Sequence, residues 1–197
     1  MSTPPREEVP LEGAAVGAPI NAAEEEVTPP PLHSRADALA AEGRYAEAAE
    51  LYAEAVAAEP NDVAALLALG AVLRAAGQYD ASEKELRQAL KLAPAMASAH
   101  YQLALTLYRR GVYATAATAL RRAIELEAAD PAFHLLLGET LNQLDEADAA
   151  IEALERAIEL DPASAKAFYA LGIAHDRKGQ PDRAAEMYRR SRELGRR

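Results

Sequence analysis

The chain has 197 residues, of which 50% are hydrophobic and 26% charged, and its formal net charge is −10. It contains no cysteine, which excludes disulfides, thiolate metal sites and a lipid-modified cysteine anchor. No run approaches the roughly 18 apolar residues of a membrane-spanning helix, and residues 1–10 lack the pattern of a secretion signal, so we expect a cytoplasmic protein. The negative charge disfavours nucleic acid and anionic membrane as partners.

The first 31 residues differ in composition from the rest of the chain. They contain seven prolines, and six glutamates against a single arginine, with few large apolar side chains. Such a segment cannot bury enough surface to offset the entropy lost on ordering, so we predict that residues 1–31 form a disordered tail rich in Pro and Glu. The tail is interpreted as a solubilising segment, with a docking ligand or a self-inhibitory strap as alternatives.

From residue 32 onward, alanine and leucine dominate and the intrinsic preference is helical. One pattern then returns every 34 residues. Its first element is a leucine followed by a small residue: Leu69-Gly70, Leu103-Ala104, Leu137-Gly138 and Leu171-Gly172. Further elements are a small residue at Ala48, Ser82, Ala116, Ala150 and Ala184, and a large one at Tyr52, Leu86, Leu120, Leu154 and Tyr188. A period of this length is typical of stacked repeat folds.

Turn residues divide each period into two helices. Gly43, Gly77 and Gly111 lie 34 apart, each two residues before a tyrosine, and Gly179 follows the same pattern near the end. Glycine supplies the left-handed conformation that closes a helix. The periods themselves are separated by prolines, often next to Asp or Asn, which favour the start of the next helix.

These features resemble the tetratricopeptide repeat family, and residues 60–94 and 162–191 are similar to its pattern over their full length. The resemblance covers residues 32–197, in five units near 29–62, 63–96, 97–130, 131–164 and 165–197. It implies an all-α, right-handed superhelical solenoid whose first helices line the concave side. Three positions depart from the pattern: Arg35 stands in a leucine position, Ala128 in a proline position and Asp145 in the position of a turn glycine.

The end of the array has a pattern of its own. A two-helix unit buries one face, and stacking of neighbouring units completes a continuous core. In the last helix, from Asp182 to about Leu194, Ala184 and Tyr188 belong to the predicted inward stripe, and the arginines fall largely elsewhere. We therefore expect this helix to cap the array. The arginines at 189, 190, 192, 196 and 197 are interpreted as its solvated face; an acidic partner or the acidic tail is the alternative, and nucleic acid comes last because aromatic stacking groups are missing between them.

No catalytic signature is present: the sequence has no phosphate-binding glycine loop, no zinc-protease motif and no nucleophile elbow. We therefore expect neither enzymatic activity nor a cofactor or metal. His100 and His134 lie 34 residues apart in equivalent positions, where a packing role is expected and a metal pair or a pH switch is the alternative. His33 and His175 carry no signal beyond an expected partial exposure.

The candidate site follows from the resemblance, which implies that ligand contacts come from the fifth, ninth and twelfth positions of the first helices. Spacings of four and three place these positions on one helix face. The residues are Leu67, Ala71, Arg74, Tyr101, Leu105, Tyr108, Leu135, Glu139, Asn142, Tyr169, Ile173 and Asp176, with His33 and Asp37 in the first unit. A surface of tyrosine and aliphatic side chains with a few polar groups suits an extended peptide or an amphipathic helix.

The sequence therefore predicts a non-catalytic scaffold or adaptor that binds a protein or peptide partner in its concave groove. Clamps for the carboxylate tail of chaperones use clustered Lys, Asn and Arg on these faces, and leucine, alanine and tyrosine stand there instead. One alternative is a self-assembling structural protein, in which array ends stack or tails are exchanged between molecules. A chaperone for secretion or envelope assembly proteins is the third reading.

Overall fold

The structure is a computed structural model that describes residues 31–196. The segment predicted to be disordered, residues 1–31, lies outside the described residues except for Pro31. Within residues 31–196 the chain forms ten helices and no strand. The helices are α1 (Leu32–Ala41), α2 (Tyr45–Ala58), α3 (Val63–Ala75), α4 (Tyr79–Leu92), α5 (Ala97–Arg110), α6 (Tyr113–Leu126), α7 (Pro131–Gln143), α8 (Ala147–Leu160), α9 (Ala165–Arg177) and α10 (Pro181–Leu194).

Side chains at the predicted breaks start several of these helices. The carboxylate of Asp62 accepts hydrogen bonds from the backbone N–H groups of residues 64 and 65 at the start of α3. The Asp130 carboxylate accepts a hydrogen bond from the backbone N–H of Ala132 at the start of α7. The Ser164 hydroxyl oxygen accepts one from the backbone N–H of Ala167 at the start of α9. These oxygens satisfy backbone donors that have no partner within the helix.

The tight turns inside each helix pair depend on residues with positive φ. Gly43, Gly77, Gly111 and Gly179 have φ between 72° and 85°, the left-handed region in which glycine carries no Cβ penalty. Asp145 occupies the equivalent position between α7 and α8 with φ 62°. Aspartate tolerates this conformation better than most residues do, which explains how the fourth pair keeps the same turn without glycine.

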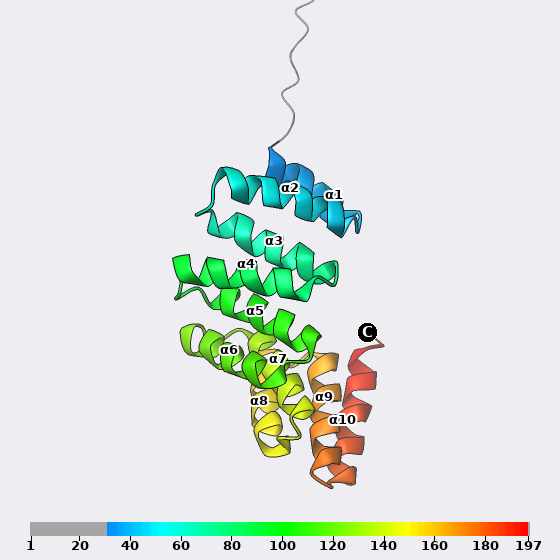
Figure 1. Ribbon diagram of the computed structural model, residues 1–197. Helices are drawn as coiled ribbons and strands as arrows, with labels where there is room; N and C mark the ends of the chain where they lie inside the picture. Colours follow the sequence, from blue (N-terminus) through cyan, green and yellow to red (C-terminus); the bar gives the residue numbers. More distant parts are fainter. Residues whose placement is uncertain (1–30, 197) are drawn as a thin grey trace, which may run out of the picture.

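The helices stack as an all-α solenoid, as predicted (Figure 1). Each first helix packs against the second helix of its own pair and against that of the preceding pair. Consecutive first helices also contact one another at α3–α5, α5–α7 and α7–α9, and no comparable contact joins consecutive second helices within residues 31–196. The first helices are therefore the closer set and line the concave side of the right-handed superhelix, whereas the second helices are spread apart outside.

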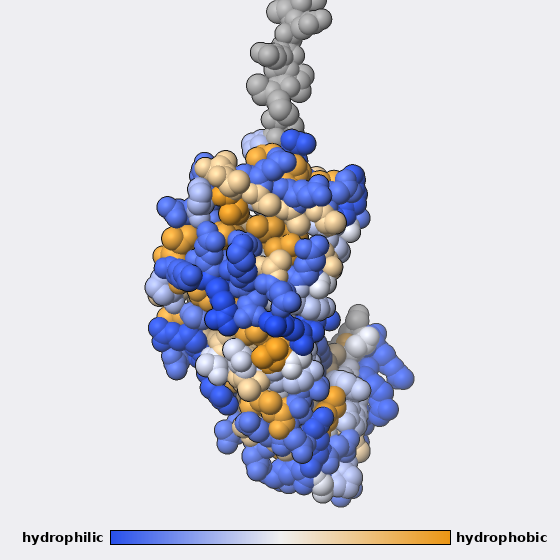
Figure 2. Space-filling model, in the orientation of Figure 1, coloured by the Kyte–Doolittle hydropathy of each residue, from blue (hydrophilic) through white to orange (hydrophobic). Residues whose placement is uncertain are grey.

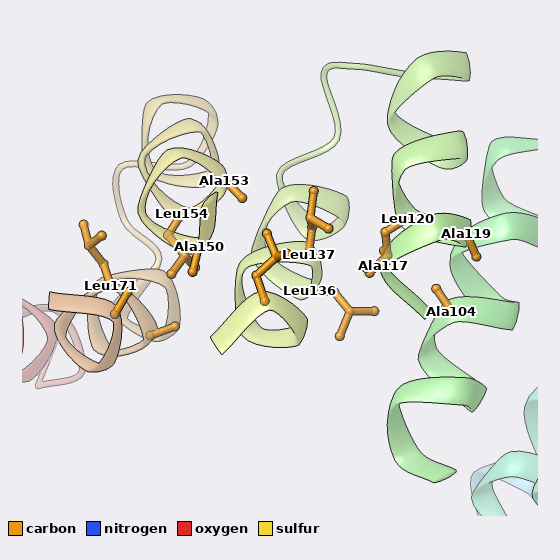
Figure 3. Close-up of a cluster of buried hydrophobic side chains, with 13 residues drawn as sticks. Ala104, Ala117, Ala119, Leu120, Leu136, Leu137, Ala150, Ala153, Leu154 and Leu171 are labelled. Carbon is orange, nitrogen blue, oxygen red and sulfur yellow. The ribbon is translucent and has the colours of Figure 1, made fainter. Parts of the chain in front are cut away.

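The core runs along the solenoid between the two layers of helices (Figure 3). Leu86, Leu120 and Leu154, which occupy the large position of the 34-residue pattern, are fully buried. Each faces the small residue of the first helix of its own pair. A Cβ atom added at Gly70 or Gly138 would lie within 2.7 Å of Leu86 or Leu154, so the small residues set how closely the paired helices approach.

Helix α10 closes the C-terminal end of the array. Ala184 is its one fully buried position; Met187, Tyr188 and Ser191 are half-buried, and the arginines from 183 to 192 are exposed. The Ser191 hydroxyl donates to the carbonyl oxygen of Ala165 at 2.7 Å, which fastens α10 to the start of α9. The outer face of α10 is polar, consistent with the capping role expected of this helix.

Candidate functional site

The concave face is formed by α3, α5, α7 and α9. The aliphatic members of the predicted site (Leu67, Ala71, Leu105, Leu135 and Ile173) are half-buried, as expected for side chains whose bases pack in the core while their ends face the groove. Tyr169 is the most accessible of the aromatic members, with 56% of its surface exposed. The structure thus brings aliphatic and aromatic groups from four neighbouring helices to one surface.

Two tyrosines of α5 form the centre of this surface. The Tyr101 ring packs on Phe133 of α7 with ring centroids 5.0 Å apart, and the Tyr108 ring packs edge-on against Tyr113 at 5.5 Å. Burial raises the pKa of both phenols above the ordinary value; Asp130 raises the pKa of Tyr101 further, and Glu139 that of Tyr108. Both hydroxyls are therefore held protonated, as hydrogen-bond donors beside apolar rings.

The charged members of the predicted site bridge neighbouring first helices. The guanidinium of Arg74 on α3 donates to the side-chain oxygen of Gln102 on α5 at 3.1 Å. Glu139 on α7 pairs with the ammonium group of Lys166 on α9, also at 3.1 Å. These groups therefore link neighbouring first helices, a role that the sequence pattern did not indicate.

Arg74 keeps unused hydrogen-bonding capacity. Its Nε atom is buried and has no hydrogen-bond partner among the described residues. Burial lowers the pKa of the guanidinium, and the nearby charge of Arg109 lowers it further. Arg74 as a whole is half-buried, so an acceptor group on a partner would meet the accessible part of the guanidinium and not the buried Nε atom.

Asn142 has a different role from the one predicted. It is 3% exposed, and its Nδ2 donates to the carbonyl oxygen of Ala170 on α9 at 3.0 Å. Its side chain is too buried to meet a partner, because the α7–α9 contact covers it. Asn142 is therefore a link between neighbouring repeats and not an accessible groove residue.

Replacing Asn142 with alanine is expected to reduce the free energy of unfolding by about 1–3 kcal/mol, because the buried Ala170 carbonyl loses its side-chain donor. Hydrogen exchange of the α9 and α10 amides should accelerate more than that of α3 and α4, since the bond joins α9 to the rest of the array. Asn142→Asp should lose at least as much stability as the alanine variant, because it replaces the NH₂ donor with an oxygen that faces the Ala170 carbonyl in a buried position. Protection of α9 equal to that of the unaltered chain would contradict the role given to this bond.

At the last repeat, part of the predicted site is engaged by α10. The Tyr188 hydroxyl donates to the carboxylate of Asp176 at 2.7 Å, and the Tyr188 ring lies 5.5 Å from that of Tyr169. In the first repeat, Tyr52 donates in the same way to Asp37. Nε2 of His33 lies 3.3 Å from a carboxylate oxygen of Asp62 at the start of α3. Asp37 and Asp176 therefore hold the second helix of the first and last pairs in place, and both remain exposed.

The histidines take structural positions. Nε2 of His100 lies 2.9 Å from the carbonyl oxygen of Pro94, and Nε2 of His134 lies 2.9 Å from that of Ala128. Each ring thus bonds the backbone six residues earlier, which supports the packing interpretation. The expectation of partial exposure holds for His33 and is wrong for His175, which is 5% exposed and bonds Gln180 at 2.9 Å. Among residues 31–196 no group of three potential metal ligands occurs.

The comparisons with known families agree with this architecture. Models described as "Tetratricopeptide repeat" match residues 39–107 and 167–196, and one described as "TPR repeat" matches residues 138–179. The chain is a tetratricopeptide repeat protein. A model of "Anaphase-promoting complex, cyclosome, subunit 3" also matches residues 87–157 across the middle repeats. No curated protein sequence matches the chain.

Solved structures of other repeat proteins superpose on most of the chain. A crystal structure of MamA is 28% identical, covers 82% of this chain and 94% of its own, and has a TM-score of 0.74. MamA from Desulfovibrio magneticus RS-1 is 27% identical over 84% of this chain and 93% of its own, with a TM-score of 0.77. The structure of YrrB is described as that of a TPR protein with an unusual peptide-binding site. It is 23% identical, covers 87% of this chain and 89% of its own, and has a TM-score of 0.69; this similarity supports the fold alone.

These matches support a general protein-binding role, and repeat proteins of this kind are typically non-catalytic. In the part of the chain that the structure describes, every helix is too short or too polar to cross a membrane.

Proposed function

We propose that this repeat protein is a non-catalytic scaffold or adaptor that binds an extended peptide or an amphipathic helix of a partner protein along its concave face. The observation that carries the proposal is the surface around Tyr101, Leu105 and Tyr108 on α5, where half-buried rings and an aliphatic side chain lie side by side. Aromatic and aliphatic groups with protonated hydroxyls suit the burial of a partner's apolar side chains and the pairing of its carbonyl groups.

The polar groups give the bound segment a direction. Arg74 places a half-buried guanidinium at the α3 end of the face, and Glu139 adds a carboxylate near Tyr108. We expect the bound segment to place a carbonyl or carboxylate against Arg74 and apolar side chains against the tyrosines. Helix α9 would add Tyr169 and Ile173 at the other end, so a ligand that spans the face touches three first helices or more.

Self-assembly by stacking of array ends gains no support from the described residues, because the outer face of α10 is polar. The exchange of tails between molecules involves residues outside the described part of the chain and remains an alternative. A chaperone for secretion or envelope assembly proteins would differ from a general adaptor only in the partner that it binds.

A pull-down from native lysate tests the proposed function. The full chain serves as bait beside a variant with Tyr101→Ala and Tyr108→Ala, and circular dichroism confirms that both baits are helical. A protein retained by the first bait and lost by the second supports groove binding. Equal recovery on both baits would contradict the concave face as the binding surface, and recovery of the chain alone would favour self-assembly.

A further inference from the structure

The outer side of the array carries a second concave surface, between α4 and α6. Because the second helices are spread apart there, the side chains of α5 form the floor of a groove with a volume of about 730 Å³. Leu90, Leu103 and Ala119 supply its apolar floor, and the Thr115 and Thr118 side chains lie along α6. This groove opens on the opposite side of the first helices from the concave face and shares none of the predicted site residues.

The rim of this groove, which we call the outer groove, is strongly basic. Four basic side chains (Arg87, Lys91, Arg121 and Arg122) line it against one acid, Glu125. Arg87 pairs with Glu83, and Arg122 pairs with Glu125, both at 2.8 Å on their own helices. No ion pair joins Lys91 or Arg121 to another residue within 31–196. In the face shown in Figure 2, hydrophilic side chains cover much of the middle of the array, where α4 and α6 lie, and apolar atoms show between them.

The next repeat provides an internal comparison. The equivalent groove between α6 and α8 has Leu137 and Ala153 where the outer groove has Leu103 and Ala119. Its lining contains two basic side chains, Arg121 and Arg156, and two acidic ones, Glu125 and Glu152. Solenoid geometry thus explains why both grooves exist, and it does not explain why one is basic. That difference points to an acidic occupant of the outer groove.

We propose that the outer groove binds the acidic N-terminal segment of the same chain, residues 1–30. This segment carries six glutamates and one arginine, the opposite sign to the groove. The sequence Glu-Glu-Val occurs in it twice, at residues 7–9 and 25–27. Each copy combines carboxylates for the basic rim with an apolar side chain for the leucine-lined floor. Ion pairs at the rim and burial of the valine would together favour binding.

The path of the chain makes this contact reachable. Each first helix begins on the edge of the array where the second helices end, so the segment joins α1 on the same edge as the C-terminal half of α4, which bears Arg87 and Lys91. The outer groove is lined by α4, α5 and α6, so it lies between one and two repeats from α2. The second Glu-Glu-Val begins seven residues before Leu32 and the first begins 25 residues before it. An extended chain advances about 3.3 Å per residue, so the two copies have a reach of roughly 20 Å and roughly 80 Å from Leu32.

The arginines of α10 are a poorer match for the segment. In α10, four arginines are mixed with three acids, and Arg190 pairs with Glu193 at 3.3 Å. The groove beside α10 is lined by two basic and two acidic side chains. Helix α10 also lies at the opposite end of the array from α1 (Figure 1). The mixture of charges in α10 and its distance from α1 therefore both favour the outer groove.

The absence of cysteine allows a direct test in the full-length chain. A single cysteine introduced by Ala23→Cys, beside the second Glu-Glu-Val, carries a nitroxide label, and paramagnetic relaxation is measured at the backbone amides by NMR. The strongest relaxation is expected around Leu90, Leu103 and Ala119. Arg87→Gln with Lys91→Gln should lower it about fivefold, the effect of losing two exposed ion pairs. Raising the salt concentration should weaken it as well.

Matched variants keep the outcome specific. Arg156→Gln with Arg190→Gln removes the same charge from the α6–α8 groove and from α10, and it should leave the relaxation pattern unchanged. Strongest relaxation at the concave face or at α10, or no relaxation above background, would overturn the proposal. So would relaxation that appears only between molecules when labelled and isotope-enriched chains are mixed, because the occupant would then be the segment of a second copy.

Discussion

Replacing Gly138 with leucine is expected to reduce the free energy of unfolding by about 3 kcal/mol, because the site between α7 and α8 has no room for a side chain. A Cβ atom at Gly138 would lie 2.3 Å from Cγ of Leu154, and Leu154 is fully buried. Either the Leu154 side chain must move or α7 and α8 must separate. Leu154 has little space to move because it is fully buried. Urea unfolding followed by far-UV circular dichroism measures the loss.

The control places the same side chain elsewhere on the same helix. Gln143 is exposed at the end of α7, so Gln143→Leu adds a leucine without meeting Leu154. Its stability should stay within about 0.5 kcal/mol of the unaltered chain, as for most surface substitutions. The third helix pair shows what the backbone can accommodate, since Ala104 occupies the position of Gly138 and belongs to the same buried cluster as Leu120. Equal stability of the Gly138 and Gln143 variants would show that close helix approach is not required there.

The second large effect concerns the concave face. Removing both Tyr101 and Tyr108 by alanine substitution is expected to weaken binding of a captured partner segment by about 2 kcal/mol or more, roughly 30-fold in Kd. Half-buried tyrosines at the centre of an interface often supply much of its binding energy, because their rings lose little conformational freedom on binding. Titration calorimetry with the segment identified by pull-down measures the change.

A control with the same number of tyrosines removed separates binding from scaffold damage. Tyr45 and Tyr79 begin α2 and α4, 34 residues apart, and neither belongs to the concave site. The Tyr45→Ala, Tyr79→Ala variant should bind the segment with unchanged affinity. If both double variants lost affinity equally, the loss would come from weakened packing of the array and not from the concave face.

The repeat architecture could be predicted from the sequence because it depends on local, periodic features. The positions of Gly43, Gly77, Gly111 and Gly179 mark the turns, and all four take the positive φ that such turns require. Asp145 departs from the pattern, yet the chain keeps the turn because aspartate tolerates the same conformation. The 34-residue spacing likewise identified Leu86, Leu120 and Leu154 as repeated core residues.

The details of the candidate site depend on contacts between repeats, which periodicity does not determine. Asn142 was assigned to the concave face because it is the twelfth position of its repeat. Whether a side chain at that position is accessible depends on the residue that faces it from the next first helix. There the Ala170 carbonyl accepts its hydrogen bond. Arg74 and Glu139 are bridged in the same way to Gln102 and Lys166.

The outer groove was beyond sequence reasoning for a related reason. It is formed by the spreading of α4 and α6, and its lining combines residues from three helices. The basic residues at 87, 91, 121 and 122 can be read in the sequence, but without the packing they are ordinary surface charges of two helices. The outer groove could have been found in the sequence by comparing the charges of residues 34 positions apart in successive second helices.

Site-directed photo-crosslinking tests the concave face as the binding surface most directly, because it locates the partner without weakening the interface. Tyr169 is 56% exposed on α9, so a photoreactive phenylalanine analogue can replace it with little disturbance of the core. The same analogue at Tyr45, which is 37% exposed at the start of α2, is the control. We expect a partner protein to be cross-linked from position 169 and not from position 45. Cross-linking from position 45 alone, or equally from both positions, would contradict binding along the concave face.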